Sequence, residues 1–545
     1  MSERRQRHYR RLWDRKLGHR QCLAGIGADA IGWTGCSASR SAGLAWCGRQ
    51  PEDVVPGEKP CYATSLSFAG YGRGAVATTH EGRLTKIEGN PSHPASLGAS
   101  DIWMQASLHG LYDPGRAQQV KEDNAPSTWN QFLEAALADL ALLRARGGRG
   151  LALLTGTVTS PALAAQIQAL LAALPAASWH AFEPLNADFE HAGARIAFGR
   201  PLDAQYRFDR ADIVVALDSD FLLSDPASLR YKREFSRRRR LSSGRSQTHA
   251  APSFNRLYAI ETFPSLTGAA ADHRLPLRPG DVEGFARALA TAVGVPSVPP
   301  SSGSNVPDGW LDAVAADLLD HRGTSIVMAG KQQPPEVHAL AHAMNVWLQN
   351  VNLTVTYTAP IAAGPTDQHA SLAGLVANMR AGRIDTLYIL GTNPVCAAPA
   401  ALGFATALAR VRNTVRLGLH DDETAELCRW RLPMSHELET WGDIRAYDGT
   451  VSIAQPTIEP LYDTRSPLEL VAALATGSDA HGQQLVHSYW KGSSTSADFE
   501  RFWERTVRQG VMHGTAELPV TVTLRPNLMF SPQTPLAVSS VPFAV

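Results

Sequence analysis

The sequence predicts an α/β protein with two related parallel-sheet units, a small β domain before them and a partial domain after them. Short apolar runs at 151–155 and 213–217 have the length and composition of buried strands, and an Ala/Leu-rich helical stretch at 161–174 lies between them. The same order returns in the second half, with apolar runs at 325–330 and 384–390. Strands that alternate with helices favour a mostly parallel sheet, because a parallel connection needs a crossover.

The spacing of these runs indicates an internal duplication. Val327 follows Leu153 by 174 positions, and Leu387 follows Ile213 by the same number. Two equal offsets predict two copies of one Rossmann-like unit, each with strands and helices in alternation.

Segments outside the two units also have clear patterns. Residues 76–88 are expected to form a β-hairpin with a tight Glu-Gly turn. A strand is expected around 520–524 and a helix around 496–508. The apolar side of that helix consists of Phe499, Phe502, Trp503 and Val507.

Composition and pattern divide the chain into six parts. They are a leader at 1–49, a small N-terminal domain at 50–130, a first α/β unit at 131–295, a Pro/Ser-rich linker at 296–323, a second α/β unit at 324–435 and a partial C-terminal domain at 436–545. Each α/β unit is thus predicted to be one continuous segment.

Composition argues against several classes of function. Lys plus Arg balance Asp plus Glu at 51 each, so no overall charge favours nucleic acid or an anionic membrane. No stretch of about 18 uncharged apolar residues predicts a membrane span. The six cysteines have no C-x-x-C spacing, which argues against a zinc or iron–sulfur site. They are Cys22, Cys36, Cys47, Cys61, Cys396 and Cys428.

The leader combines a basic segment at 4–11 with a weakly apolar stretch that ends at Cys36. This resembles a twin-arginine export signal with a lipoprotein-type cysteine. Asp29 interrupts the apolar stretch, so either the signal is degenerate or the leader is a reading-frame accident, and we expect inefficient processing.

The region richest in motifs starts where the apolar run at 384–390 ends. A turn follows, and it consists of Gly391, Thr392, Asn393 and Pro394. Loops at the carboxyl ends of parallel strands are where α/β sheets bind ligands. An ET pair at 423–424, an LP pair at 432–433 and the segment WGDIRAYDG at 441–449 come later in the chain.

This ordered series resembles the molybdopterin oxidoreductase superfamily, in which the asparagine turn reaches the nucleotide end of the pterin cofactor. The resemblance implies that Gly391, Thr392, Asn393 and Pro394 are a vestigial pterin-nucleotide turn. The segment 441–449 is most similar to the large subunit of alternative complex III, a bacterial quinol-oxidising respiratory assembly. That subunit has lost the pterin, and it continues into a cysteine-rich, ferredoxin-like domain that this sequence does not contain.

Two further segments carry the same resemblance. Residues 89–94, GNPSHP, and 271–280, ADHRLPLRPG, are similar to segments of the superfamily, where the first packs beside a four-cysteine iron–sulfur cluster. Here Cys61 stands alone, so no cluster is expected. No molybdenum ligand can be placed in the first unit, and His93, between two prolines, is expected to be a turn residue.

The resemblance therefore implies a molybdopterin oxidoreductase-like subunit of a respiratory quinol:electron-acceptor oxidoreductase, a scaffold without a cofactor or metal of its own. Its expected partners are an integral membrane quinol-binding subunit and a cytochrome c subunit, with no nucleic acid. An exported protein would lie on the periplasmic side of the bacterial inner membrane, and a cytoplasmic location stays open. Two alternatives also stay open: a catalytic enzyme that binds molybdopterin guanine dinucleotide, and a non-enzymatic remnant of a split or truncated gene.

Other polar groups favour structural roles. His338 and His342 lie four apart on a predicted helix but lack the glutamate and third ligand of a zinc site. The basic run at 232–240 is expected to be a solvated face, with an acidic partner or phosphate as the alternative. Glu261, at the tip of a strand, either caps its loop or accepts ribose hydroxyls.

Glu437 and Glu439 do not form a recognisable acid/base pair, because no nucleophile is identifiable near them in the sequence.

Overall fold

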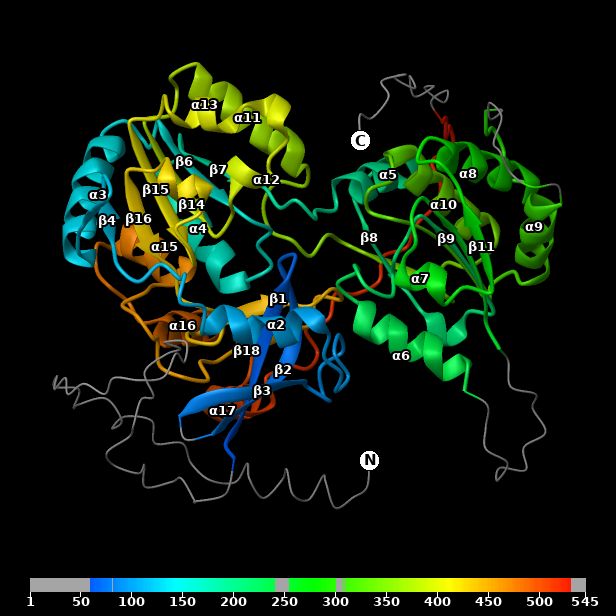
Figure 1. The fold of residues 1–545 in the computed structure, drawn as a ribbon, viewed down its shortest axis with the longest axis horizontal. Helices are drawn as coiled ribbons and strands as arrows, with labels where there is room; N and C mark the ends of the chain where they lie inside the picture. Colours follow the sequence, from blue (N-terminus) through cyan, green and yellow to red (C-terminus); the bar gives the residue numbers. More distant parts are fainter. Residues whose placement is uncertain (1–58, 81, 241–253, 300–306, 308, 531–545) are drawn as a thin grey trace, which may run out of the picture. The chain divides into compact units, whose positions relative to one another are not determined.

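The structure is a computed structural model that divides into two compact units (Figure 1). It describes residues 59–80, 82–240, 254–299, 307 and 309–530. Unit 1 contains the described residues up to 181 together with 373–446 and 450–514, and unit 2 contains 182–372, 447–449 and the described residues from 515. The predicted leader with Cys36 lies outside the described residues.

Unit 1 begins with a small antiparallel sheet. Its strands are β1 (Cys61–Phe68), β2 (Tyr71–His80) and β3 (Arg83–Gly89). The β2–β3 pair is the hairpin expected from the sequence, and His80 pairs with Arg83 across its tip. Strand β1 was not expected, and helix α2 (Ile102–Leu111) packs against β3.

A larger sheet forms the centre of unit 1. Its order is β5-β4-β16-β15-β14-β6-β7, and the five strands from β16 to β7 are parallel. The strands are β4 (Lys121–Glu122), β5 (Ala125–Pro126), β6 (Leu151–Thr155), β7 (Ser178–Ala181), β14 (Thr386–Leu390), β15 (Asn413–Gly418) and β16 (Trp430–Pro433).

Three helices cover one face of this sheet: α3 (Trp129–Arg144), α4 (Pro161–Ala173) and α15 (Pro467–Thr476). Alternate strand residues such as Leu153, Tyr388 and Val415 pack against them in one buried cluster, as the two-residue period of a strand requires. The other elements of unit 1 are α12 (Pro394–Ala397), η2 (Ala400–Leu402), α13 (Phe404–Leu408), α14 (Glu423–Glu426), β17 (Gly442–Arg445), β18 (Val451–Ala454), α16 (Gly482–Ser493) and α17 (Phe499–Gln509).

Unit 2 has a parallel sheet of order β11-β10-β9-β12. Its strands are β9 (Ile213–Leu217), β10 (Arg256–Glu261), β11 (His273–Pro276) and β12 (Ser325–Ala329), and a separate antiparallel pair is formed by β8 (Asp203–Tyr206) and β13 (Val355–Thr358). The helices are α5 (Asp188–Phe198), η1 (Phe208–Arg210), α6 (Ser228–Arg238), α7 (Leu266–Ala269), α8 (Asp281–Ala292), α9 (Trp310–Asp320) and α10 (Pro335–Trp347). Helix α11 (Gln368–Arg380) spans the division between the units.

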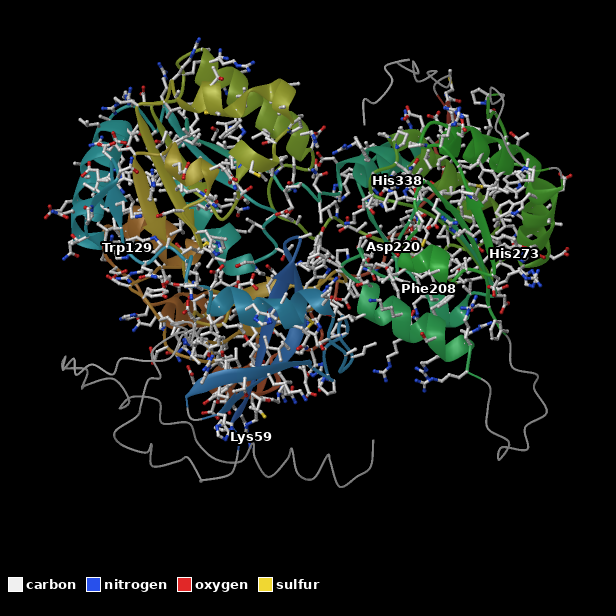
Figure 2. The ribbon with its side chains drawn as sticks, viewed as in Figure 1. Lys59, Trp129, Phe208, Asp220, His273 and His338 are labelled. Atoms are coloured by element: carbon white, nitrogen blue, oxygen red, sulfur yellow. The ribbon has the colours of Figure 1, made fainter. Side chains whose placement is uncertain are left out.

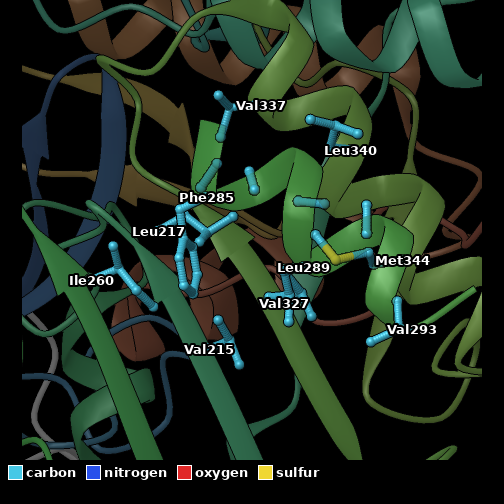
Figure 3. Packing of buried hydrophobic residues seen from close by; sticks show 14 of the residues in the cluster. Val215, Leu217, Ile260, Phe285, Leu289, Val293, Val327, Val337, Leu340 and Met344 are labelled. Carbon is cyan, nitrogen blue, oxygen red and sulfur yellow. The ribbon is translucent and has the colours of Figure 1, made fainter. Parts of the chain in front are cut away.

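The core of unit 2 lies between its sheet and the helices α8 and α10 (Figure 3). Val215, Leu217 and Val327 point from the strands toward Phe285 of α8 and Met344 of α10. All five side chains are almost fully buried, so each contributes roughly 1.5–3 kcal/mol to folding by leaving water.

The strand pairing differs from the predicted division into continuous units at 131–295 and 324–435. Strand β6 of the first half pairs with β14 of the second, and β12 of the second half pairs with β9 of the first. The strand orders β6-β14-β15-β16 and β12-β9-β10-β11 correspond, so the duplication takes the form of exchanged copies. Equal offsets fit both arrangements, because the offset does not depend on which strands pair.

The carboxyl-terminal expectations have mixed outcomes. Helix α17 carries Phe499 and Trp503 in a buried cluster with Val451 and Ile453, which confirms the predicted apolar side. The strand expected around 520–524 is wrong, since that segment forms only a single described backbone hydrogen bond to a strand, from Val520 N to the carbonyl of Tyr357 at 2.8 Å.

The described helices include none that is both long and apolar enough to cross a bilayer.

Candidate functional site

The turn Gly391–Pro394 lies at the carboxyl end of β14, the middle one of the five parallel strands in the unit 1 sheet. Gly391 has a φ of +76°, which suits a residue without a side chain, and Pro394 opens the short helix α12. Asn393 caps that helix through its side chain. The turn therefore occupies the edge where open α/β sheets bind ligands.

The side chain of Asn393 is engaged inside unit 1. Its Oδ1 accepts a hydrogen bond from Thr424 Oγ1 at 2.6 Å, and its Nδ2 donates to Glu423 Oε2 at 2.7 Å. The same threonine hydroxyl accepts from the backbone N–H of Val395 at 3.1 Å. These contacts join the loop after β14 to helix α14.

One carboxylate next to this turn, that of Glu423, has no ion-pair partner among the described residues. Glu423 is exposed, and the hydrogen bond from Asn393 lowers the pKa of its carboxyl group, so it is ionised at neutral pH. Asp421 and Asp422 precede it at the end of β15, and they form ion pairs with Lys121 and Arg416 at 2.6 Å each. A pterin nucleotide carries an anionic diphosphate, which favours backbone N–H groups and cations. The side chains beside Asn393 do not fit that group.

The equivalent turn of unit 2 has the same architecture. Asp220, labelled in Figure 2, is the third residue after β9, as Asn393 is the third after β14. Its Oδ1 accepts from Thr267 N at 3.0 Å and from Thr267 Oγ1 at 2.8 Å. The hydroxyl of Thr267 accepts from the backbone N–H of Leu222 at 3.3 Å, as Thr424 does in unit 1. Both turns thus use a short polar side chain to bind a threonine that follows the next strand, β10 in unit 2 and β15 in unit 1.

The loop after β10 is also held by internal contacts. Glu261 is buried, accepts a hydrogen bond from Ser265 Oγ at 2.6 Å and pairs with Arg274. Gly268 lies so close that an added Cβ would meet the carboxylate at 2.0 Å. The carboxylate therefore caps its loop, which is the first of the two roles considered for it.

The described cysteines and histidines form no metal centre: no group of three or more His, Cys, Asp or Glu side chains in the described part of the chain can hold an ion. Cys61, Cys396 and Cys428 are free thiols. Burial raises the pKa of Cys428 to about 12, so this thiol stays protonated and is a poor ligand.

The three histidines singled out from the sequence are buried. Burial lowers the pKa of His338 to about 4 and that of His342 to about 3, and His342 Nδ1 lies 3.0 Å from the hydroxyl of Tyr357. His93 is the expected turn residue, since its Nδ1 accepts from the N–H of Ala95 at 3.1 Å. All three are neutral components of the packed interior.

Two buried carboxylates are more important to the structure than the sequence indicated. Glu439 accepts two hydrogen bonds from Arg116, at 2.9 and 2.6 Å, and both side chains are inaccessible to solvent. Asp443 accepts from Ala162 N at 3.2 Å and from Trp490 Nε1 at 2.9 Å, and burial raises its pKa to about 6.

The two residues lie within or just before the segment 441–449 that carried the family resemblance. Their partners are at least 47 positions away, so only the fold reveals the pairs. Glu437 has a separate partner, the backbone N–H of Ser67 at 2.9 Å, and it forms no acid/base pair with Glu439.

Comparisons with known proteins agree with this architecture. No known family profile matches the chain. Among solved structures, acetylene hydratase from Pelobacter acetylenicus superposes with a TM-score of 0.58 at 11% identity, over 78% of this chain and 71% of that chain. The chain therefore has the fold of the molybdopterin oxidoreductases.

A relative identified by its sequence supports the similarity seen in the fold. It is the "Menaquinone reductase, molybdopterin-binding-like subunit" of Nitratidesulfovibrio vulgaris (strain Hildenborough), 24% identical over 95% of this chain and 80% of its own length. The resemblance to the molybdopterin oxidoreductase superfamily that the motifs indicated is confirmed.

Proposed function

We propose that this chain is a subunit of a respiratory quinol:electron-acceptor oxidoreductase of the alternative complex III type, and that it is a scaffold without a pterin or metal of its own. The relative named as a menaquinone reductase subunit supports the first part, because it aligns with 95% of the chain and its name specifies a quinone as reactant. The phrase "molybdopterin-binding-like" in that name is compatible with a protein that has this fold but does not bind the cofactor.

The observation that carries the second part is the bonding of Asn393. Both polar atoms of its amide have partners inside unit 1, and one partner is the carboxylate of Glu423. A cofactor nucleotide would have to displace these contacts and approach an ionised carboxylate, which is unfavourable by both hydrogen bonding and charge. The turn is sufficiently explained by packing.

The proposal assigns partners to the chain. Electron transfer to and from a quinol requires a subunit in the membrane and an electron carrier, and we expect an integral membrane quinol-binding subunit and a cytochrome c subunit. If it is exported, this chain would then lie on the periplasmic side of the bacterial inner membrane. This chain supplies a protein surface that holds those subunits together.

Purification of the tagged chain from membranes in mild detergent tests the assignment. We expect mass spectrometry to find a polytopic membrane subunit and a c-type cytochrome in stoichiometric amounts, and the preparation to oxidise a quinol analogue. The variant Asn393→Ala should retain the same subunits and the same turnover, because the amide has a packing role. A chain that purifies alone from both membrane and soluble fractions would contradict the proposal.

A further inference from the structure

Helix α6 and the residues that follow it concentrate positive charge on unit 2. Seven basic residues and one acidic residue lie between Ser228 and Arg240, in a chain whose overall charge is zero. This is the basic run that the sequence left open between a solvated face and a binding face. The respiratory assignment makes no use of it.

Aromatic contacts fix one side of α6 to unit 2. Tyr231 packs against Phe208 with ring centroids 4.9 Å apart, and Phe235 packs against Phe221 at 5.9 Å. Both α6 side chains are buried, so the helix cannot rotate without loss of this core. Its orientation, and that of the charges on its other sides, is therefore set by the fold.

Part of the positive charge is balanced within the unit. Arg238 pairs with Asp212 and Arg239 with Asp272, which holds both guanidinium groups in place. Arg237 is exposed and has no ion-pair partner among the residues that the structure describes. The face is thus rigid and keeps an excess of cations.

A pocket of about 380 Å³ opens beside these charges. Leu222, Phe235, Leu266 and Ala270 supply its apolar lining, and Lys232 and Arg239 supply its cationic rim. We call this site the α6 pocket. Leu266 of this lining is 50% exposed, so the apolar part of the pocket is open to solvent.

We propose that the α6 pocket binds an acidic segment of another polypeptide, with one bulky apolar side chain in the pocket and carboxylates against Lys232 and Arg239. Interfaces often bind through a large side chain in a desolvated pocket, with complementary charges around it. The volume is at the small end of ligand pockets and suits a single side chain and its neighbours.

The shape favours a peptide over other anions. An anionic bilayer is flat and cannot fill a hollow, and the apolar lining offers nothing to the phosphates of a nucleic acid. A peptide satisfies both parts of the site, because it can project a Leu or Phe side chain between acidic residues. This inference goes beyond the proposed function and depends only on the α6 surface.

Fluorescence anisotropy with the full chain tests the proposal. The probe is a labelled peptide of Asp and Glu residues around a central Leu-Phe pair, and the control peptide has Ser-Gly in place of that pair. We expect the probe to bind at least about tenfold tighter than the control, since each factor of ten corresponds to about 1.4 kcal/mol. Lys232→Glu and Leu266→Ser should each weaken the probe by about tenfold.

A matched variant separates the site from overall charge. Arg322→Glu changes an exposed arginine of unit 2 that does not line the pocket, so it should leave binding unchanged. Thermal unfolding of each variant checks that the fold is intact.

Three results would overturn the proposal. They are failure of the wild-type chain to bind the probe, equal affinity for the two peptides, and unchanged affinity in Leu266→Ser. Sedimentation with vesicles of phosphatidylserine and phosphatidylcholine, without peptide binding, would assign the face to a membrane.

Discussion

The turns after β14 in unit 1 and after β9 in unit 2 perform one structural task with different side chains. In unit 1 a neutral amide, Asn393, bonds to Thr424, and in unit 2 a carboxylate, Asp220, bonds to Thr267. The residue directly after each strand has a positive φ, +76° at Gly391 and +54° at Asp218. The backbone requirement is therefore shared, although only one turn has the glycine that it favours.

The comparison shows that this turn can form without an asparagine or the other residues of the Gly-Thr-Asn-Pro motif. Asp218 tolerates its conformation because Thr262 N donates to its carboxylate at 2.8 Å and Gln333 Nε2 donates at 2.8 Å. Unit 2 thus forms the same turn with none of the four residues of the Gly-Thr-Asn-Pro motif that resembles a pterin-nucleotide turn. The hydrogen bond between the turn after the strand and the threonine that follows the next strand is sufficient to account for the presence of Asn393.

The exchange of strands between the copies gives the largest predicted effect. A fragment of residues 151–296 contains β6 and β9 but lacks their partners β14 and β12. We expect this fragment to show no cooperative unfolding transition by circular dichroism and to aggregate, because one sheet would lose its interior strand β14 and the other its edge strand β12, which exposes apolar faces. A soluble, cooperatively folded fragment would show that each half of the chain folds on its own.

The sequence predicted the elements of this fold better than their pairing. The α/β class, the central strands and the repeat spacing follow from local apolar patterns, which a single chain displays directly. The strands of the structure are offset by 174 positions between β6 and β12 and by 173 between β9 and β14. The exchange of β6 and β12 does not, since partner choice depends on contacts across more than a hundred positions. The short strands β4 and β5 carry too little local pattern to be found.

The helices α4 and α10 occupy equivalent places but differ in their response to acid. His338 and His342 of α10 stand where α4 has Ala164 and Gln168. Burial keeps both histidines neutral in the folded protein down to about pH 4 and 3, whereas the unfolded chain takes up protons below about pH 6.5. Protonation therefore favours the unfolded chain, so the free energy of unfolding is highest above about pH 6.5 and decreases as the pH falls toward the folded-state pKa values.

At about pH 5 each histidine should cost about 2 kcal/mol of stability relative to neutral pH. The variant His338→Ala/His342→Gln gives α10 the residues of α4, so it should lose about 4 kcal/mol less than the wild type over this range. Urea unfolding at the two pH values measures the difference. An equal loss in both proteins would show that other groups control the acid response.

The two turns themselves give the smallest effects. Asp220→Ala should destabilise the protein by about 2 kcal/mol, because buried Thr267 loses a charge-assisted partner. Asn393→Ala should cost about 1 kcal/mol, since its amide is neutral and only partly buried. A Thr424→Val background should abolish most of the second effect. A larger cost at Asn393 than at Asp220 would reverse the comparison.

The contacts at the candidate site were harder to predict from the sequence than the fold was. The turn at 391–394 was located correctly as a strand-end loop, but its partners, Thr424 and Glu423, belong to the short helix α14, and a sequence gives no distance between separate segments. The same holds for Glu439, whose buried partner Arg116 lies 323 positions away. Local patterns identify which residues are unusual, and the fold decides what they contact.

Cofactor analysis of the purified full-length chain tests the central claim most directly. Acid extraction should release no fluorescent pterin, and metal analysis should find molybdenum, tungsten and iron far below one atom per chain, because Asn393 is bonded to Thr424 and Glu423. Near-stoichiometric pterin and molybdenum that disappear in Asn393→Ala would contradict this account and would establish the turn as a cofactor site.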